Sequence, residues 1–135
     1  MTQEGKEVGL EEIRRLAVVA ARAAAAKVGA DTVVLEVGAV LAIADHFVIT
    51  SAANARQVRT ITEEVEAKVS ESGGLKPLRI EGLDDARWVL MDYGDFVVHV
   101  FVEEVRRYYD IERLWSDAPR VEWEDDAQTR TALST

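Results

Sequence analysis

Residues 87–101 read RWVLMDYGDFVVHVF, two apolar runs on either side of a polar DYGD. A strand with one face in water alternates apolar and polar residues, and these two runs barely alternate. A two-residue turn at Gly94 and Asp95 would join the runs as an antiparallel hairpin, because glycine in the first turn position suits a type II′ turn. Tyr93 then lies opposite Phe96, and this pair fixes the register of the whole hairpin.

This register divides the hairpin side chains between two faces, because opposed residues share a face. One face is apolar apart from a tyrosine hydroxyl, and we expect it to be the core side. It carries Val89, Met91, Tyr93, Phe96, Val98 and Val100. The other face carries Trp88, Leu90, Asp92, Val97, His99 and Phe101. Large aromatic side chains beside a few polar groups suit either a second layer of helices or a protein interface.

Apolar side chains at three- and four-residue steps predict helices over residues 10–28, 54–72 and 103–115. Asn54 is placed to cap the second of these helices. Tyr108 is expected in the apolar stripe of the third.

Strands are expected over residues 32–37, 45–52 and 77–82, ahead of the hairpin. The resulting order is α-β-β-α-β-β-β-α. Helices against a small mixed sheet of about five strands predict an α/β (α+β) sandwich. The helical crossover over residues 54–72 allows one parallel strand pair.

The composition describes one acidic domain. The chain has 135 residues, 48% of them hydrophobic, and a net charge of −9. Phosphate backbones repel such a chain, so a basic protein is a better partner than a nucleic acid. We divide the chain into a flexible N-terminus (1–8), a folded domain (9–118) and an acidic, disordered tail (119–135), within which Trp123 could dock locally.

The same composition argues against several kinds of functional site and against secretion or a place in the membrane. There is no cysteine, which excludes thiol nucleophiles, disulfides and thiolate metal ligands and fits a reducing cytoplasm. No signal peptide and no membrane-spanning stretch are predicted. We therefore expect a cytoplasmic protein.

Three pairs of polar residues are candidates for chemistry. His99 with Asp92 could act in acid–base catalysis, but a satisfied polar residue on a strand is the favoured interpretation. Asp92 and Asp95 could attract Mg²⁺, yet no phosphate-binding glycine loop precedes a helix. Asp45 and His46 point to opposite faces of a strand and form no dyad. No catalytic residue, metal or cofactor is therefore expected.

Three blocks resemble the Iojap-like ribosomal silencing factor family. They are ADHFVITSAANARQV (44–58), ARWVLMDYGDFVVHVF (86–101) and RRYYDIERLW (106–115). The resemblance extends from the first helix to about Ala118. It implies a small domain similar to the nucleotidyltransferase fold but without that fold's catalysis. It also implies a translational repressor that binds the large ribosomal subunit through its fourteenth protein and blocks joining of the small subunit when nutrients are short.

The resemblance also implies site residues. The partner contact is expected among Trp88, Leu90, Asp92, Tyr93, Asp95, His99 and Phe101. Tyr109 and Trp115 match aromatic positions of the family and are expected to be more structural. His46 stands where the family commonly has an aromatic residue. Residues 52–55 lack the usual glycine and serine, which puts any residual nucleotide binding in that loop in doubt.

Two alternatives stay open at this stage. One is a nucleotidyltransferase-like, nucleotide-binding enzyme that would use Asp45, Asp92 or Asp95. The other is a homodimer that buries the aromatic face of the hairpin against a second copy. The sequence leaves open whether that face meets the ribosome, a second copy or the chain's own helices.

Overall fold

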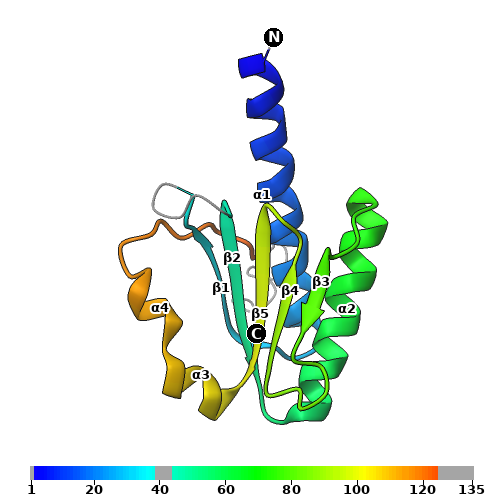
Figure 1. Cartoon of the computed structure of the whole chain (residues 1–135), viewed down its shortest axis with the longest axis vertical. Coiled ribbons are helices and arrows are strands. Elements are labelled where there is room, and N and C mark those ends of the chain that lie inside the picture. The colour runs from blue at the N-terminus through cyan, green and yellow to red at the C-terminus, as the bar shows by residue number, and fades with distance from the viewer. Residues whose placement is uncertain (1, 39–43, 125–135) are drawn as a thin grey trace, which may run out of the picture.

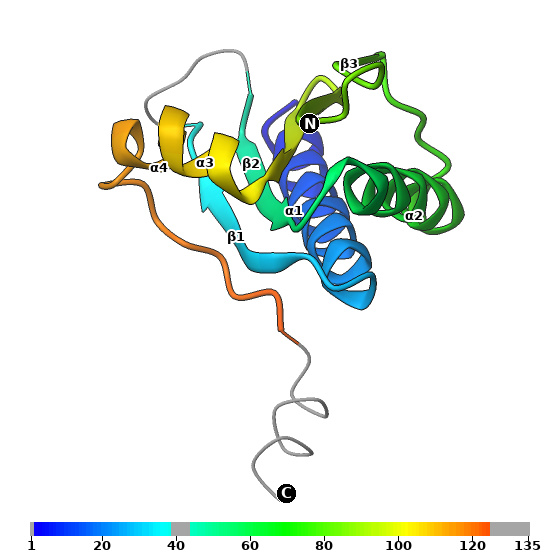
Figure 2. The same ribbon diagram turned by 90° about the horizontal axis from the view of Figure 1, so that it is seen from below.

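The computed structural model describes residues 2–38 and 44–124, with side chains described from Gly9 onward. A single mixed sheet lies between two unequal layers of helices (Figures 1 and 2). The elements are α1 (Thr2–Ala26), β1 (Ala30–Glu36), β2 (His46–Ala52), α2 (Ala55–Gly73), β3 (Arg79–Glu81), β4 (Trp88–Asp92), β5 (Phe96–Val102), α3 (Glu103–Tyr109) and α4 (Ile111–Leu114). The α+β class and the five-stranded mixed sheet predicted from the sequence are confirmed.

The strand order is β1-β2-β5-β4-β3, and β2 with β5 is the parallel pair among otherwise antiparallel neighbours. The predicted hairpin register is confirmed, since Trp88 pairs with Phe101 and Leu90 pairs with His99. Because the crossover helix α2 separates β2 from the last three strands, the hairpin returns β5 to the centre of the sheet. The hairpin therefore decides the topology.

The turn of the hairpin depends on its glycine. Gly94 has φ 89°, a backbone conformation that residues with a Cβ rarely adopt. The Tyr93 amide donates to the Phe96 carbonyl oxygen at 3.0 Å, so the turn has two central residues as predicted. The Asp92 carboxylate accepts a hydrogen bond from the Gly94 amide at 2.8 Å, which braces the turn from its N-terminal side.

The face predicted as the core side packs against α1 and α2 (Figure 2). From the hairpin it contributes Val89, Met91, Val98 and Val100, all fully buried. From α1 it meets Ala17, Ala20 and Ala24, whose small side chains let the helix approach the sheet closely. Asn54 caps α2 as predicted, because its side-chain oxygen accepts from the Gln57 amide at 2.9 Å.

Two helices differ from the prediction. The helix α1 begins at Thr2 rather than at residue 10, because its first turns are polar all round and carry no apolar period to detect. The predicted helix 103–115 breaks at Asp110, which has φ 44°. Tyr108, expected in the core, is 82% exposed, because α3 turns Arg106 rather than Tyr108 toward the sheet.

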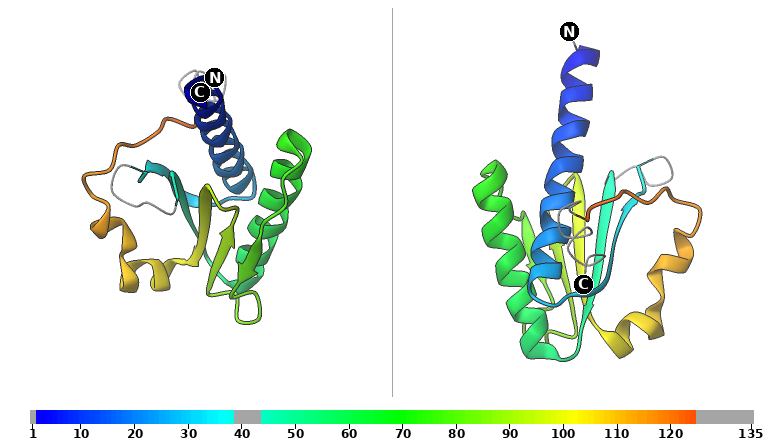
Figure 3. Two further views of the ribbon diagram at one scale, coloured as in Figure 1. Left: turned by 45° about the horizontal axis from the view of Figure 1, so that its top comes forward. Right: turned by 180° about the vertical axis from the view of Figure 1, so that it is seen from behind.

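The segment after α4 passes along the outer edge of β1 and ends beside α1 (Figure 3). The Val121 amide donates to the Val34 carbonyl at 2.9 Å, and the Val121 side chain is buried. Residues 119–124, predicted as part of a disordered tail, therefore cover a sheet edge. The rest of that predicted tail, residues 125–135, lies outside the described residues, as does Met1.

Within the described ranges, none of the helices has the length and apolar character needed to cross a membrane.

Candidate protein-binding surface

The second face of the sheet is only partly covered. Helix α3 contacts β5 and β2 on this face, whereas α1 and α2 lie on the other side (Figure 2). Rings from strands and helices meet beneath α3 and α4 and form an aromatic cluster. Its members are Phe47, Trp88, His99, Phe101, Tyr109 and Trp115. The outer strands β4 and β3 continue this face beyond the helices.

Trp88 lies at the border between the covered and the uncovered part. Its ring stacks on Phe101 with centroids 4.8 Å apart, and its other side meets Tyr109 at 5.0 Å. Its indole N–H donates to Nδ1 of His99 at 3.2 Å. These three contacts fix the orientation of a half-buried indole, so the exposed part of the ring is a rigid apolar surface.

His99 serves this arrangement as a buried acceptor. Its side chain is 5% exposed, and burial lowers the pKa of His99 to about 4. At neutral pH the ring is therefore uncharged, with its proton on Nε2 because Nδ1 accepts from Trp88. Nε2 has no hydrogen-bond partner among the described groups, so the satisfied histidine expected from the sequence is satisfied at one nitrogen only. Trp88 rather than Asp92 orients this histidine. The acid–base pair considered from the sequence is thus not assembled.

Asp92 and Asp95 lie at the other end of β4, near the turn. The Asp92 carboxylate accepts from the Gly94 amide at 2.8 Å and from Nε of Arg79 at 3.2 Å. Asp95 has an exposed side chain, and its carbonyl accepts from the Asp45 amide at 2.7 Å. Across the described residues, His, Asp and Glu side chains form no group of three able to hold a metal ion.

The structure divides the seven predicted contact residues into two sets. Trp88, Leu90 and Asp92 are half-buried on the second face, and Asp95 is exposed. The other three are buried in this structure: Tyr93, His99 and Phe101.

Tyr93 also lies on the opposite face from the other contact candidates, as the register required. Its ring stacks on Phe96 with centroids 4.6 Å apart. Its hydroxyl is buried without a hydrogen-bond partner among the described groups, and burial raises the pKa of Tyr93 well above its ordinary value. Direct contact between a partner and Tyr93 would require the α1 and α2 layer to move.

Sequence reasoning missed the exposed tyrosines of α3. Tyr108 is 82% exposed and Tyr109 is 55% exposed, and their rings meet at 5.0 Å. Together with Trp88 they line an open groove of about 540 Å³, on whose rim lie Asp85 and Glu104. We call the set Trp88, Leu90, Asp92, Tyr108 and Tyr109 the β4–α3 surface.

A signal for this surface did exist in the sequence. An aspartate follows the paired tyrosines in RRYYD, and aspartate tolerates the left-handed conformation that ends a helix. A helix that ends at Asp110 does not continue to Ile111 and Trp115, so the apolar stripe that placed Tyr108 in the core loses its support. The position of Trp88 also depends on Gly82, since a Cβ at residue 82 would lie 2.1 Å from the Trp88 carbonyl oxygen.

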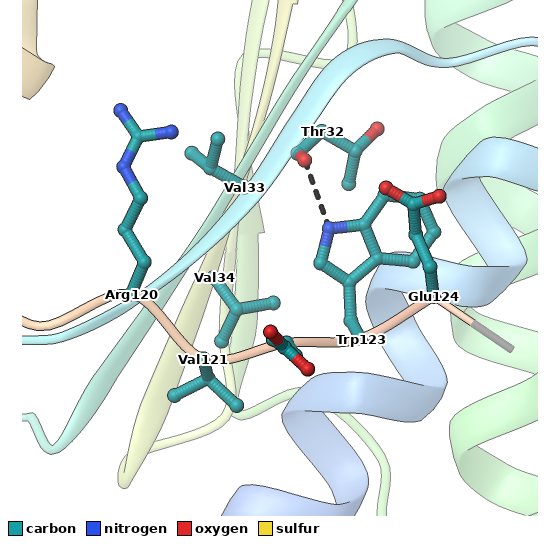
Figure 4. Close-up of a pocket in the computed structure, with 8 residues that line it drawn as sticks. Thr32, Val33, Val34, Arg120, Val121, Trp123 and Glu124 are labelled. Carbon is teal, nitrogen blue, oxygen red and sulfur yellow. Dashed lines mark hydrogen bonds between the residues drawn. The ribbon is translucent and has the colours of Figure 1, made fainter. Parts of the chain in front are cut away.

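A second hollow, of about 490 Å³, lies between β1 and residues 120–124 (Figure 4). The Trp123 indole points back toward β1 and donates to the Thr32 carbonyl at 2.9 Å. Arg22 of α1 in turn donates to the Trp123 carbonyl at 2.8 Å. These bonds explain the local docking predicted for Trp123, and the hollow belongs to the packing of this segment.

Comparison with known proteins agrees with this architecture. Residues 10–135 match the family model described as ribosomal silencing factor during starvation. A ribosomal silencing factor of Halalkalibacterium halodurans is 46% identical over 92 residues, which cover 68% of this chain and 78% of that protein. A crystal structure of a Chromobacterium violaceum protein superposes with a TM-score of 0.73 at 33% identity, covering 77% of this chain and 86% of that one.

A more distant relative is named for the assembly of the large ribosomal subunit. The mouse mitochondrial assembly of ribosomal large subunit protein 1 is 28% identical over 88 residues, which cover 64% of this chain and 39% of that protein. The family model covers nearly the whole described domain, including the hairpin, the aromatic cluster and the β4–α3 surface. This chain therefore belongs to the family of ribosomal silencing factors that act during starvation.

Proposed function

We propose that this chain represses translation by binding the large ribosomal subunit through that subunit's fourteenth protein, so that the small subunit cannot join when nutrients are short. Family membership supports the silencing role, and its name describes a regulator rather than an enzyme. The observation that carries the proposal is the β4–α3 surface, an exposed aromatic strip where helix α3 meets the outer strand β4.

The apolar part of this surface has the character of an interface centre. Trp88 is held from three sides by Phe101, Tyr109 and His99, so little ordering of its side chain is needed on binding. Tryptophan and tyrosine dominate the binding energy of many interfaces when they are packed and partly exposed in this way. Leu90 extends the apolar strip along β4.

The charge of the chain selects the kind of partner. The net charge of the chain is −9. Asp85 and Glu104 line the groove, and Asp92 and Asp95 lie near the hairpin turn. Two arginines lie there as well, and each is paired with one of these acids: Arg87 with Glu104 and Arg79 with Asp92. Ribosomal RNA repels such a surface, whereas the basic side chains of a ribosomal protein attract it and steer its approach. A ribosomal protein is thus favoured over RNA as the direct contact, and the bacterial cytoplasm is the compartment that this role implies.

The predicted contact residues take two roles in this proposal. Trp88, Leu90, Asp92 and Asp95 reach the partner directly. Tyr93, His99 and Phe101 act from beneath, by holding the strands and the indole in place. The mouse relative named for large-subunit assembly supports a partner on that subunit.

The anti-association role is tested by sedimentation of purified subunits in sucrose gradients, at a magnesium concentration that joins them. The wild-type chain should sediment with the large subunit and reduce the fraction of joined ribosomes. If saturating wild-type protein leaves the joined fraction unchanged, the proposed role is wrong.

The specific partner is tested by pull-down with the isolated fourteenth protein of the large subunit. We expect capture by the wild-type chain and loss of capture by Trp88→Ala. Capture of large subunits without capture of the isolated protein would keep the subunit as partner and reject the specific contact.

The two alternatives from the sequence have their own tests. Heat release or turnover on titration with nucleotide and Mg²⁺ would support an enzyme, for which Asp45, Asp92 and Asp95 would be the candidates. Light scattering over a range of concentrations measures self-association. A homodimer that uses the β4–α3 surface should compete with large-subunit binding.

A further inference from the structure

Arg106 is a buried cation at the junction of α3, β1 and β2. Among the side chains that the structure describes, it is the single Lys, Arg, Asp or Glu that is buried, with 8% of its surface exposed. Burying a charge costs free energy unless partners replace the lost water. We propose that Arg106 is a positioning residue, which holds the kinked α3–α4 unit so that the β4–α3 surface keeps its binding shape. This inference rests on the proposed function.

Every N–H of the Arg106 guanidinium has an acceptor. Nε and Nη2 donate to the two carboxylate oxygens of Glu112 at 2.8 and 3.1 Å. Nη1 donates to the Ala30 carbonyl at 3.1 Å and to the Ser51 hydroxyl at 3.0 Å, and Nη2 also donates to the Asp31 carbonyl at 2.7 Å. A guanidinium has five N–H donors, and the five bonds use all of them.

The carbonyls that Arg106 binds lie where the sheet is irregular. The pairing of β1 with β2 shifts register between Ala30 and Val33, and Asp31 has φ 49°. Carbonyls at such a bulge are left outside the regular ladder. Arg106 supplies donors to two of them, and its hold on Ser51 ties α3 to β2 as well.

The Glu112 bond spans the break between the two helices. Asp110 has φ 44° and ψ 52°, and its amide donates to the Arg106 carbonyl at 2.9 Å. Glu112 lies beyond that break and returns to the Arg106 side chain, so main chain and side chain of one residue fix both sides of the kink. A bidentate arginine–carboxylate pair is directional, and it therefore sets the angle between α3 and α4.

The kink in turn places the aromatic residues of the site. Tyr109 precedes Asp110 and packs against Trp88 at 5.0 Å. Trp115 follows α4 and meets Phe47 edge to face at 5.6 Å. If α3–α4 lost its hold on the sheet, Tyr109 would leave Trp88 and one wall of the groove would be displaced.

A matched control lies one residue along the chain. Arg107 is also an arginine of α3, but it is exposed and pairs with Glu103 on the surface at 3.4 Å. Arg106→Met and Arg107→Met remove the same charge from the same helix. Arg106→Lys keeps the charge and supplies three donors in place of five, so it should restore the function only in part.

The experiment measures two quantities on each full-length variant, below its unfolding temperature. These are the affinity for purified large subunits and the hydrogen exchange of amides 103–114. For Arg106→Met we expect binding about tenfold weaker or more and exchange about tenfold faster, because several hydrogen bonds to a buried charge are lost. Arg107→Met should change either quantity by less than about twofold. Arg106→Lys should lie between wild type and Arg106→Met.

Glu112→Gln keeps the test decisive if Arg106→Met does not fold. It removes the negative charge of the Arg106–Glu112 pair while keeping one side-chain acceptor. We therefore expect faster exchange and weaker binding than in the wild-type chain, as for Arg106→Met. Unchanged exchange in the folded Arg106 and Glu112 variants would overturn the positioning role. Faster exchange with unchanged affinity would overturn it as well, since the surface would then not depend on the kink.

Failure of the proposed function is distinguishable from failure of this inference. If the wild-type chain does not bind large subunits, the proposed function is wrong and Arg106 positions no ribosome-binding surface. Exchange of amides 103–114 then still decides whether Arg106 holds the kink. If the wild-type chain binds and Arg106→Met binds equally well, the proposed function stands and the inference about Arg106 fails.

Discussion

The two faces of the same sheet differ in how completely the helices cover them. On the α1 and α2 side, Val89, Met91, Val98 and Val100 are fully buried against small and branched apolar side chains. On the α3 and α4 side, rings and polar groups mix, and the cover ends at Trp88. The first face closes the core of the fold, and the second leaves part of its apolar surface exposed, where we propose that a partner binds. Substitutions at neighbouring residues of one strand should therefore affect either the stability of the fold or the binding of a partner, depending on the face.

The largest expected difference is between Met91 and Leu90. Met91→Ala should lower the free energy of unfolding by about 2–5 kcal/mol, because it leaves a cavity in a closed core. Leu90→Ala should cost less, about 1 kcal/mol, since its side chain is only partly buried and its loss leaves no closed cavity. Urea unfolding of both variants measures the contrast. Equal losses of stability would mean that the two faces are equally closed.

A second contrast compares two tryptophans that each donate one indole hydrogen bond. Trp88→Ala should weaken large-subunit binding by about 2–4 kcal/mol, or roughly 30- to 1,000-fold, as expected for a central anchor. Trp123 lies at the β1 edge, and Trp123→Ala should leave binding within about twofold of wild type. Titration of fluorescently labelled chain with large subunits measures both. Similar losses of affinity in the two variants would mean that the β4–α3 surface is not the contact.

The third contrast is pH-dependent and concerns His99. Its pKa is about 4 in the folded chain, against about 6.5 when unfolded, because burial disfavours the charged ring. The unfolded chain therefore binds more protons between these values. The stability from this group is complete above pH ~6.5 and is lost as pH falls toward 4. Between pH 7 and 5 the wild-type chain should lose about 2 kcal/mol more stability than His99→Gln.

Thermal unfolding of both proteins at several pH values checks this difference. Glutamine keeps an acceptor for the Trp88 indole, and both chains retain His46 and all carboxylates, so their titration cancels. Equal losses in the two chains between pH 7 and 5 would mean that His99 is not the buried neutral acceptor described above.

The smallest expected effect is at the edge of the α1 and α2 face. Val121 belongs to the segment that follows α4, and its side chain is buried in the core at this edge. Val121→Ala should therefore lower the free energy of unfolding by about 1–2 kcal/mol. Glu122 is exposed, and Glu122→Ala should change it by less than about 0.5 kcal/mol. Urea unfolding compares the two. No effect of Val121→Ala would show that residues 119–124 are not part of the folded domain.

How much could be predicted from the sequence depended on whether the decisive interaction was local. The Gly94 turn fixed the register of the hairpin, and the register separated the two faces correctly. The exposure of each face could not be predicted, because it depends on where α3 and α4 pack, and that packing follows from the Asp110 kink and the Arg106 bonds to β1 and β2. Tyr108 was accordingly placed in the core although it is exposed, and the burial of His99, a predicted contact residue, was not foreseen.

Apart from the local docking of Trp123, the packing of residues 119–124 was not predicted, for a similar reason. The segment has no sustained period of its own, and its hydrogen bonds are made to Thr32 and Val34, far away in the sequence. The face on which Trp88 and Asp92 lie was predicted correctly, since the hairpin register alone defines it.

The most direct test of the account adds one positive charge to either side of the sheet. Leu90→Lys places a cation in the middle of the β4–α3 surface, while Ala67→Lys places the same charge on the exposed side of α2. Both variants have the same net charge, and affinity for purified large subunits is measured for each after their unfolding temperatures are checked. We predict at least about tenfold weaker binding for Leu90→Lys and no change for Ala67→Lys, because the added cation repels a basic partner. Equal affinities for the two variants would contradict the claim that this face binds the ribosome.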